Sequence, residues 1–329
     1  MSRSLPTMFA SALASAVRAP SPYNTQPWRF VVDGETIEVW LDRTRVLGVA
    51  DPLAREARLS CGAAAFNAVV HLRSNGLATV VRTIPDPAEP DLLAVIRLDG
   101  NQKITQTDHD LAEAVFRRHT NRRPFLDQQV SPAVRAALKW AALQEGGQVE
   151  YLDASGRYST VTTLVRRAEA LQENDPAFQA ETASWLRRDA GSPDGVPTIA
   201  TGPPPYGARA VSLRASHANQ ELPPREFEQD PLLAAVLTRD RGPYAEVRAG
   251  MAMQHVLLTA TAAGLATSFL SQPFESAQTR DALERIFDGL GQPHTLLRIG
   301  YGQPTATTAR RAVADVMTRR ATPDVPARS

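Results

Sequence analysis

Two segments of this chain match each other, and this repeat constrains the fold more than any other feature of the sequence. Residues 61–72 form a run of small and apolar residues that leads to Gly76, and residues 249–258 form a second run that leads to Gly264. The two glycines set an offset of 188 residues between the runs. Each run predicts a helix that is apolar nearly all round and that stops at a C′ glycine.

Matching strands follow both helices. Residues 80–81 and 268–270 give a strand-like segment after each glycine, and residues 93–98 and 295–299 give a later strand in each half. Chance similarity between two Ala-rich buried helices would explain one such match. The shared order of helix, glycine and later strand favours a duplication.

The two apolar helices need cover on every side, because neither has a polar face. Small residues in both, above all Gly62 and Gly250, would let their backbones approach closely. We therefore expect the helices to pack against each other at a pseudo-twofold axis, as equivalent helices do in a symmetric dimer. The expected fold class is α+β, with one half over residues 1–105 and the other over residues 106–329.

Local signals predict further elements. Residues 28–42 read as a hairpin with its turn at Asp33 and Gly34. Asp51 and Pro52 read as a helix start, with an N-cap carboxylate and a proline in the first turn. In the second half the expected elements are a helix over residues 131–145, a strand over residues 149–152 and a helix over about residues 160–171.

A proline-rich stretch over about residues 191–230 interrupts the second half. Its many prolines, three of them consecutive at residues 203–205, oppose regular structure. Stretches of this length are usually functional lids or linkers. Because it lies inside the second half and not at the junction between the halves, we expect a lid.

Charge and cysteine content exclude several classes of protein. The net charge of +1 offers no electrostatic case for nucleic acid or an anionic membrane as partner. The single cysteine, Cys61, rules out a disulfide within the chain and fits a reducing compartment. Residues 1–18 lack a signal-peptide pattern, and the uncharged residues 249–274 read as a buried helix that runs into a strand. We expect a cytoplasmic protein.

Two short segments carry the candidate chemistry. Residues 117–125 contain four arginines, a threonine hydroxyl and an amide, which suit a phosphate, although a solvated basic turn would look the same. Residues 20–28 form a proline-stiffened loop that presents Ser21, Asn24 and Gln26. Such a loop suits hydrogen bonding to a planar heterocycle, or it is a connection whose amides satisfy backbone groups.

Other cofactor and catalytic patterns are absent from the sequence. It contains no strand-linked G-x-G-x-x-G, no Walker loop and no G-x-S-x-G elbow. The six histidines show no metal-ligand spacing. We therefore expect neither a metal site nor a hydrolytic triad.

The two segments resemble those of a known family. Residues 20–28 look like the flavin-contacting loop of FMN-dependent nitroreductases, and residues 118–122 are similar to that family's Arg-Arg-Ser-x-Arg phosphate motif. Most of the chain outside the proline-rich stretch resembles the tandem Acg-type NAD(P)H nitroreductases. The stretches that carry this resemblance are residues 51–53, 55–56, 60–64, 118–125, 264–272 and 298–302.

The resemblance implies a nitroreductase-like fold, with two half-domains in tandem that form an intramolecular pseudo-dimer. In the family each subunit carries both motifs, and FMN lies at the dimer interface. Here the first half keeps the loop and lacks the arginine motif, whereas the second half keeps the arginine motif and has residues 143–149 in place of the loop. One composite FMN site is therefore expected, and the chain can exist as a monomer.

The resemblance also implies the residues of the site. Ser271 and Gln272 are placed near the reactive flavin nitrogen, and Arg310 and Arg311 on the phosphate, unless the last two form only a basic tail. The expected FMN-binding residues are Pro20, Ser21, Pro22, Asn24, Gln26, Arg118, His119, Thr120, Asn121, Arg122, Ser271, Gln272, Arg310 and Arg311.

The implied function is FMN-dependent reduction of a small electrophile, such as a nitroaromatic or a quinone, by NAD(P)H. In this family the flavin carries the redox chemistry, so no acid–base catalytic residue is named. The alternative is a protein that stores or sequesters FMN under a lid without turnover. The loss of one site and the long insertion support that alternative.

Overall fold

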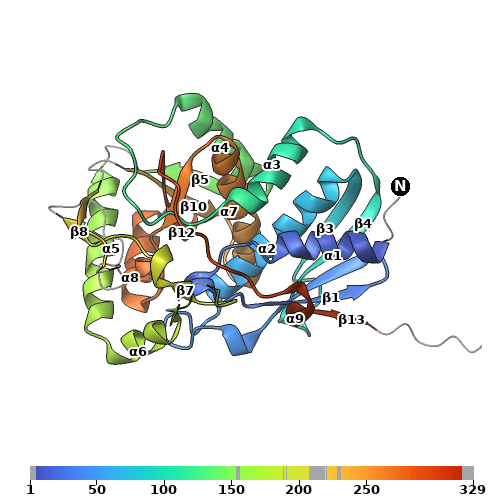
Figure 1. Ribbon diagram of the computed structural model, residues 1–329, viewed down its shortest axis with the longest axis horizontal. Coiled ribbons are helices and arrows are strands. Elements are labelled where there is room, and N and C mark those ends of the chain that lie inside the picture. Colours follow the sequence, from blue (N-terminus) through green and yellow to red (C-terminus); the bar gives the residue numbers. More distant parts are fainter. Residues whose placement is uncertain are drawn as a thin grey trace, which may run out of the picture.

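Helices and strands mix in an α+β fold. The structure is a computed structural model that describes residues 5–152, 156–187, 189, 191–206, 219, 221–227 and 231–320. Two long helices, α2 (Arg55–Ser74) and α7 (Pro243–Ala262), run through the middle of the molecule, with the blue and cyan first half on one side and the green to orange second half on the other (Figure 1). A sheet lies in each half.

The first sheet is built from strands of the first half and one late strand. Its strands are β1 (Trp28–Asp33), β2 (Thr36–Leu41), β3 (Leu77–Thr83), β4 (Leu92–Asn101) and β13 (Met317–Arg319), in the order β13-β1-β2-β4-β3. Only β13, from the C-terminal end, pairs in parallel. β1 and β2 form the expected hairpin, which is confirmed.

The second sheet repeats this connectivity. It consists of β5 (Gln148–Tyr151), β10 (Leu232–Thr238), β11 (Ala266–Phe269) and β12 (Gln292–Gly300), in the order β11-β12-β10-β5. In each half the third strand along the chain (β3 or β11) lies at the edge of the sheet, and the fourth (β4 or β12) lies between the third and the second. These strands pair antiparallel in both sheets. Where the first half turns directly from β1 to β2, the second half inserts the whole segment between β5 and β10.

Helices surround the sheets, and the inserted segment adds short elements of its own. The helices are α1 (Leu5–Ala16), α3 (Gln106–Arg117), α4 (Pro132–Gln144), α5 (Gly156–Glu173), α6 (Pro176–Ser184), α8 (Ala277–Ile286) and α9 (Val313–Val316). The short strands of the insertion are β6 (Leu186–Arg187), β7 (Val196–Pro197), β8 (Pro205–Tyr206) and β9 (Arg225–Glu226). Of the expected lid, residues 207–218, 220 and 228–230 lie outside the described residues.

The central helices meet backbone to backbone. A methyl carbon added at Gly62 would lie 2.1 Å from the carbonyl oxygen of Val247, and one added at Gly250 would lie 2.0 Å from the carbonyl oxygen of Leu59. The same offset of 188 residues that separates Gly62 from Gly250 separates Leu59 from Val247. The contact is therefore isologous, as at a twofold axis.

Side chains further along the two helices repeat this exchange. Asn67 accepts a hydrogen bond from Gln254 at 2.7 Å, and the rings of Phe66 and His255 stack with centroids 4.8 Å apart. Under the same offset Phe66 corresponds to Gln254, and Asn67 to His255. Phe66 thus contacts His255, the counterpart of Asn67, and Asn67 contacts Gln254, the counterpart of Phe66. This exchange of contacts supports the duplication.

The sequence predicts where the two central helices stop, but it does not predict where α2 begins. Gly76 and Gly264 follow the two helices with φ of +80° and +76°, so the C′ glycines are confirmed. The expected helix start at Asp51 and Pro52 is wrong, because α2 begins at Arg55 after Ala54, which has φ of +55°. The Asp51 carboxylate still accepts hydrogen bonds from Arg55 N at 2.8 Å and Ala57 N at 2.9 Å, and thus caps the helix from outside it.

The remaining expected elements of the second half are present. The helix over residues 131–145 is α4, capped by Ser131, whose side chain accepts from Val134 N. The strand is β5, and the next helix, α5, begins at Gly156, earlier than expected. Within the described part of the chain, no helix has the length and hydropathy to cross a membrane.

A substitution at the helix crossing tests its closeness. Gly250→Ala should lower the free energy of unfolding by about 3 kcal/mol, the upper part of the range for overpacked positions, because the new methyl group meets backbone atoms that cannot move aside. Urea unfolding of the two proteins measures the difference. Gly156→Ala, a helical glycine with open space around it, is the matched control and should cost nothing. Equal stability of Gly250→Ala and wild type would contradict the close contact.

Candidate functional site

A cavity of about 750 Å³ lies where the two halves meet; we call it the main cavity. Residues of α2, the end of β11 and the C-terminal segment line it together with both sequence motifs. The expected site residues that line it are Pro20, Ser21, Pro22, Asn24, Arg118, His119, Thr120, Arg122, Ser271 and Arg310.

The loop at Pro22–Asn24 has a constrained backbone. Tyr23, Asn24 and Gln26 have φ of +49°, +59° and +53°, values that side-chain-bearing residues rarely adopt. The Ser21 hydroxyl accepts a hydrogen bond from Gln26 N at 2.9 Å, which closes the loop. Strained backbone of this kind persists only where its surroundings hold it, and it clusters at ligand sites.

Arg118 is a buried cation in the wall of the main cavity. Only 5% of its surface is exposed, and it forms no ion pair with any residue that the structure describes. Its Nε and Nη1 have no hydrogen-bond partner there, and its one bond is a long one, 3.4 Å, from Nη2 to Arg18 O. Burial, with Arg18 and Arg122 nearby, lowers the pKa of Arg118 to about 10.

Arg310 is a second buried cation beside the first. It donates to backbone oxygens, including Ala19 O at 3.2 Å, while its Nε lacks a partner among the described residues. Burial, then Arg118 and Arg18, lowers the pKa of Arg310 to about 9. The folded chain therefore holds two like charges in its interior without a described counter-ion. This arrangement suits a multiply charged anion such as a phosphate, which accepts several guanidinium hydrogen bonds.

Asn121 and Gln272 stand behind the cavity wall and do not line it. Asn121 donates from Nδ2 to Gln303 O at 2.8 Å and accepts from Arg123 N at 3.0 Å, which fixes the turn of the arginine segment. Gln272 follows the lining residue Ser271, and its carbonyl oxygen accepts from Gln172 at 3.0 Å. Both residues position their neighbours.

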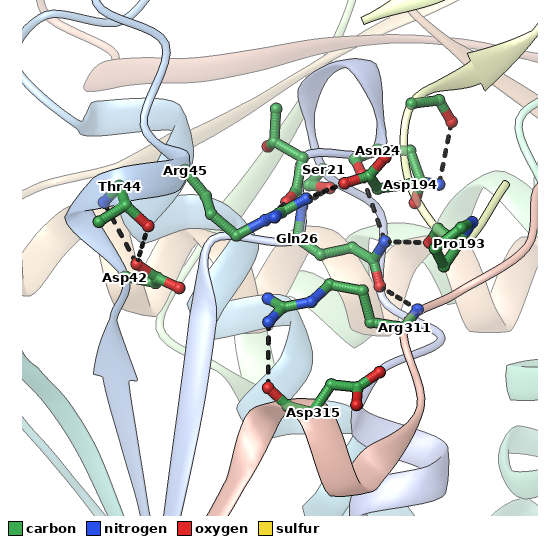
Figure 2. A network of polar contacts seen from close by, with 12 residues as sticks. Ser21, Asn24, Gln26, Asp42, Thr44, Arg45, Pro193, Asp194, Arg311 and Asp315 are labelled. Atoms are coloured by element: carbon green, nitrogen blue, oxygen red, sulfur yellow. Dashed lines mark hydrogen bonds and ion pairs between the residues drawn. The ribbon is translucent and has the colours of Figure 1, made fainter. Parts of the chain in front are cut away.

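Gln26 and Arg311 also lie outside the lining and join three parts of the chain. The Gln26 side chain accepts from Arg311 N at 2.9 Å and donates to Pro193 O at 2.8 Å (Figure 2). The Arg311 guanidinium donates to Asp315 O at 3.0 Å. Gln26 thus ties the N-terminal loop to both the C-terminal segment and the insertion.

The insertion is tied to the first half by a segment that we call the strap, residues 193–196. Asn24 donates to Gly195 O at 3.0 Å. Asp194 pairs with Arg45 at 2.5 Å (Figure 2) and with Arg187 at 3.1 Å. Burial opposes the charge of Asp194, but the hydrogen bonds from the two arginines outweigh it and lower the pKa of Asp194. The strap ends at Val196, which lines the cavity.

Several lining residues have no local signal in the sequence. Glu56, Leu59 and Ser60 come from the first turns of α2, and Met253 comes from α7. The sequence presents both helices as buried core, and nothing in their pattern separates a residue that faces the other helix from one that faces a cavity. The adjacent residues Arg55 and Glu56 are among those that carry the family resemblance, but the resemblance implies no function for them.

The symmetry-related position is filled by protein. Ser60, which lines the main cavity, corresponds to Arg248 under the offset of 188 residues. A methyl carbon added at Gly146, where the second half lacks the loop motif, would lie 3.0 Å from the guanidinium of Arg248. A long side chain thus stands where the first site has a serine.

The fold and the main cavity bring two arginines, Arg118 and Arg310, into one cavity between two similar halves. Residues 115–301 match the sequence profile described as the nitroreductase family. Two relatives come from Mycobacterium tuberculosis (strain ATCC 25618 / H37Rv). "Putative NAD(P)H nitroreductase Rv3131" is 35% identical over 322 residues, 93% of this chain and 90% of that one. "Putative NAD(P)H nitroreductase acg" is 30% identical over 318 residues, 94% of this chain and 95% of that one.

Among solved structures, the chain is similar to the FMN-dependent nitroreductase NfnB from Mycobacterium smegmatis in complex with NADPH. The TM-score is 0.38 at 16% identity, over 68% of this chain and 99% of that chain. On the sequence matches, this chain belongs to the nitroreductase family. The resemblance drawn from the motifs and the α+β nitroreductase-like fold are confirmed.

The buried arginines predict how the ligand-free protein responds to phosphate. A guanidinium whose pKa is lowered by folding destabilises the folded chain at neutral pH, and this cost fades only above about pH 10. Inorganic phosphate at about 100 times its Kd should stabilise the protein by about 2.7 kcal/mol. In Arg118→Met the Tm without phosphate should equal or exceed that of wild type, and the phosphate-dependent rise should vanish.

Differential scanning calorimetry at several phosphate concentrations measures both effects. Arg117→Met, which removes an exposed arginine next in the chain, is the matched control and should respond as wild type does. An unchanged phosphate response in Arg118→Met would show that this guanidinium does not bind the anion.

Proposed function

We propose that this chain binds one FMN in the main cavity, between a first half over residues 1–105 and a second half over residues 106–329, and uses NAD(P)H to reduce a small electrophile such as a nitroaromatic or a quinone. The observation that carries the proposal is the pair of buried guanidiniums, Arg118 and Arg310, without a described counter-ion. A cytoplasmic location, inferred from charge and cysteine content, is part of the proposal.

The residues of the main cavity fit FMN. The orphaned nitrogen atoms of Arg118 and Arg310 match the needs of a phosphate monoester, which carries nearly two negative charges at neutral pH. Ser21 and the prolines that flank it, which also line the cavity, offer a rigid edge for a planar ring. Ser271 lies at the end of β11, where the family resemblance places contacts to the reactive nitrogen.

Bound FMN supplies the hydride and electron chemistry of this family. The chain contributes orientation and exclusion of water. Arg118 and Arg310 fix the phosphate end and the constrained loop at Tyr23 fixes the position of Ser21. The strap covers the cavity through Val196, and in a cavity closed to water the arginine charges act more strongly than they would in solvent.

The expected stoichiometry follows from the asymmetry of the halves. The loop motif occurs only in the first half and the arginine motif only in the second, so the proposed site needs both at once. Because α2 and α7 already bury their apolar surfaces on each other, the chain has internalised the interface that a family dimer uses. A monomer with one FMN is therefore the proposed functional unit.

A second candidate function, storage or sequestration of FMN, is favoured by the strap. Hydrogen bonds from Asn24 and Gln26 and the ion pair of Asp194 with Arg45 fasten it to the first half. A cover held at so many points would slow both the release of a ligand and the access of a second molecule. The two candidates differ in whether NAD(P)H reaches the flavin.

Flavin titration tests the phosphate assignment and the stoichiometry. Wild type should saturate at about one FMN per chain. Arg118→Met should weaken FMN binding by about 1.5–3 kcal/mol, the range for a charge-assisted contact, and should weaken binding of riboflavin, which lacks the phosphate, far less. Fluorescence quenching gives both dissociation constants, with Arg117→Met as control. Equal losses for the two flavins, or two tightly bound FMN per chain, would contradict the composite site.

Anaerobic absorption spectra separate an enzyme from a store. If the chain is a reductase, excess NADPH or NADH should bleach the bound FMN within seconds, and a quinone or nitroaromatic should restore its colour. If it is a store, dithionite will bleach the flavin and the nicotinamides will not. Asp194→Asn, which removes both ion pairs of the strap, should then let NADPH react and should speed the release of FMN.

A further inference from the structure

A second cavity, of about 640 Å³, adjoins the main cavity. Glu56 and Leu59 of α2 line both cavities. The second cavity also lies at the first turn of α7. The proposed function does not use this cavity, whose lining includes Arg55 and Glu56.

The charges that line the second cavity leave one arginine without an ion pair. Glu284 lies 3.1 Å from Arg241 and 3.6 Å from Arg55, and Glu246 lies 2.5 Å from Arg58 and 3.8 Å from Arg55. These carboxylates are thus already paired with arginines. Arg280, half-buried, donates to a backbone oxygen, that of Phe274 at 3.0 Å, and forms no ion pair within the described residues.

The electrostatics at Arg280 favour an incoming anion. Burial, and then the nearby Arg55, lower the pKa of Arg280, while Asp281, Glu284 and Asp51 act in the opposite direction without cancelling the shift. His294 also lines the cavity, and burial lowers its pKa to about 4, so it is neutral at pH 7 and competes for no anion. The N-cap of α7 is Gly242, which offers no capping side chain, and the positive end of this 20-residue helix faces the cavity.

A buried amide provides an independent sign of a ligand. Gln292 lines the second cavity and is only 7% exposed. Its Nε2 donates to Glu284 at 2.7 Å, which fixes the orientation of the amide, so the remaining atom must be the acceptor Oε1. That oxygen is buried and has no partner among the residues described. A buried acceptor of this kind calls for a hydroxyl or amino donor from a bound molecule or a water.

We propose that the second cavity binds the ADP-ribose end of NAD(P)H, with Arg280 and Arg241 at its phosphates and Gln292 Oε1 at a hydroxyl or amino group of the adenosine. The proposal rests on the proposed function, because the adjoining main cavity must then hold the flavin to which the nicotinamide end delivers its hydride. Phe274, also in the lining, offers an apolar surface for the adenine ring. The ADP-ribose end and the nicotinamide end would join beside Leu59 and Glu56, which line both cavities.

The test uses fragments that lack one end of the coenzyme. ADP-ribose and its 2′-phosphate carry no nicotinamide, and N-benzyl-1,4-dihydronicotinamide carries no phosphate. In the full FMN-loaded protein, Arg280→Met should weaken calorimetric binding of the ADP-ribose compounds about tenfold or more, as loss of a charge-assisted contact does. It should raise the KM for NADPH or NADH by a similar factor and leave the KM for the benzyl donor unchanged.

Two further variants keep the test decisive. Arg285→Met removes an exposed arginine from the same helix α8 and should behave as wild type. Arg241→Met, whose side chain is 70% exposed, should fold in any case and should also weaken ADP-ribose binding. If Arg280→Met and Arg241→Met bind the ADP-ribose compounds as wild type does, or if the KM rises equally for both hydride donors, the second cavity does not hold the nucleotide.

Failure of the proposed function would look different. A protein that binds no FMN, or whose FMN neither donor reduces, refutes that proposal, whereas the calorimetry with ADP-ribose compounds needs no hydride transfer. Absence of calorimetric binding by wild type, in a protein whose FMN is reduced equally well by NADPH and the benzyl donor, refutes the nucleotide site alone.

Discussion

The backbone contact between α2 and α7 is the constraint on which the rest of the structure depends. Gly62 and Gly250 let each of two helices without a polar face approach the backbone carbonyl groups of the other. Each helix thereby helps to bury the other. The exchange symmetry extends to charge. Arg58 and Glu246 hold equivalent positions under the repeat and form an ion pair of 2.5 Å. In a symmetric dimer the same positions would carry identical residues, so one chain has used its freedom to make the two halves complementary.

This freedom accounts for the difference between the main cavity and the position related to it by the repeat. In the first half the loop, Ser60 and the start of α2 leave a space that the second half completes with its arginine segment. At the related position Arg248 lies against Gly146 and occupies the space. The second half diverges again between β5 and β10, where an insertion replaces a tight turn. The strap that belongs to this insertion returns to the first half, and its Val196 lines the main cavity.

Electrostatics link the main cavity to the second one. In the main cavity Arg118 and Arg310 lie near each other without a described carboxylate partner. In the second cavity two carboxylates, Glu246 and Glu284, pair with arginines, and Arg280 has no ion pair within the described residues. The unpaired arginines of the main cavity suit a compact dianion that is held from several sides. The arginines of the second cavity suit phosphates that bind beside existing ion pairs. A molecule with a phosphate end could use either, but only a long one could reach from the second cavity to the first.

Much of the fold is readable from the residues alone, because the signals are local or periodic. The apolar helices, their C′ glycines, the hairpin of β1 and β2 and the clustered arginines need no knowledge of distant contacts. The roles of Asn24 and Gln26 are not readable in this way. Both amides sit in the loop that resembles a flavin-binding segment, yet their hydrogen bonds run to the strap and to the C-terminal segment, residues that lie far along the chain. Glu56 and Gln292 are similar cases, since a buried position in a helix or strand does not reveal whether its side chain meets core or cavity. Pattern and propensity determine which elements form and which repeat; only packing across the two halves decides which polar atoms find partners inside the chain and which are left for a ligand.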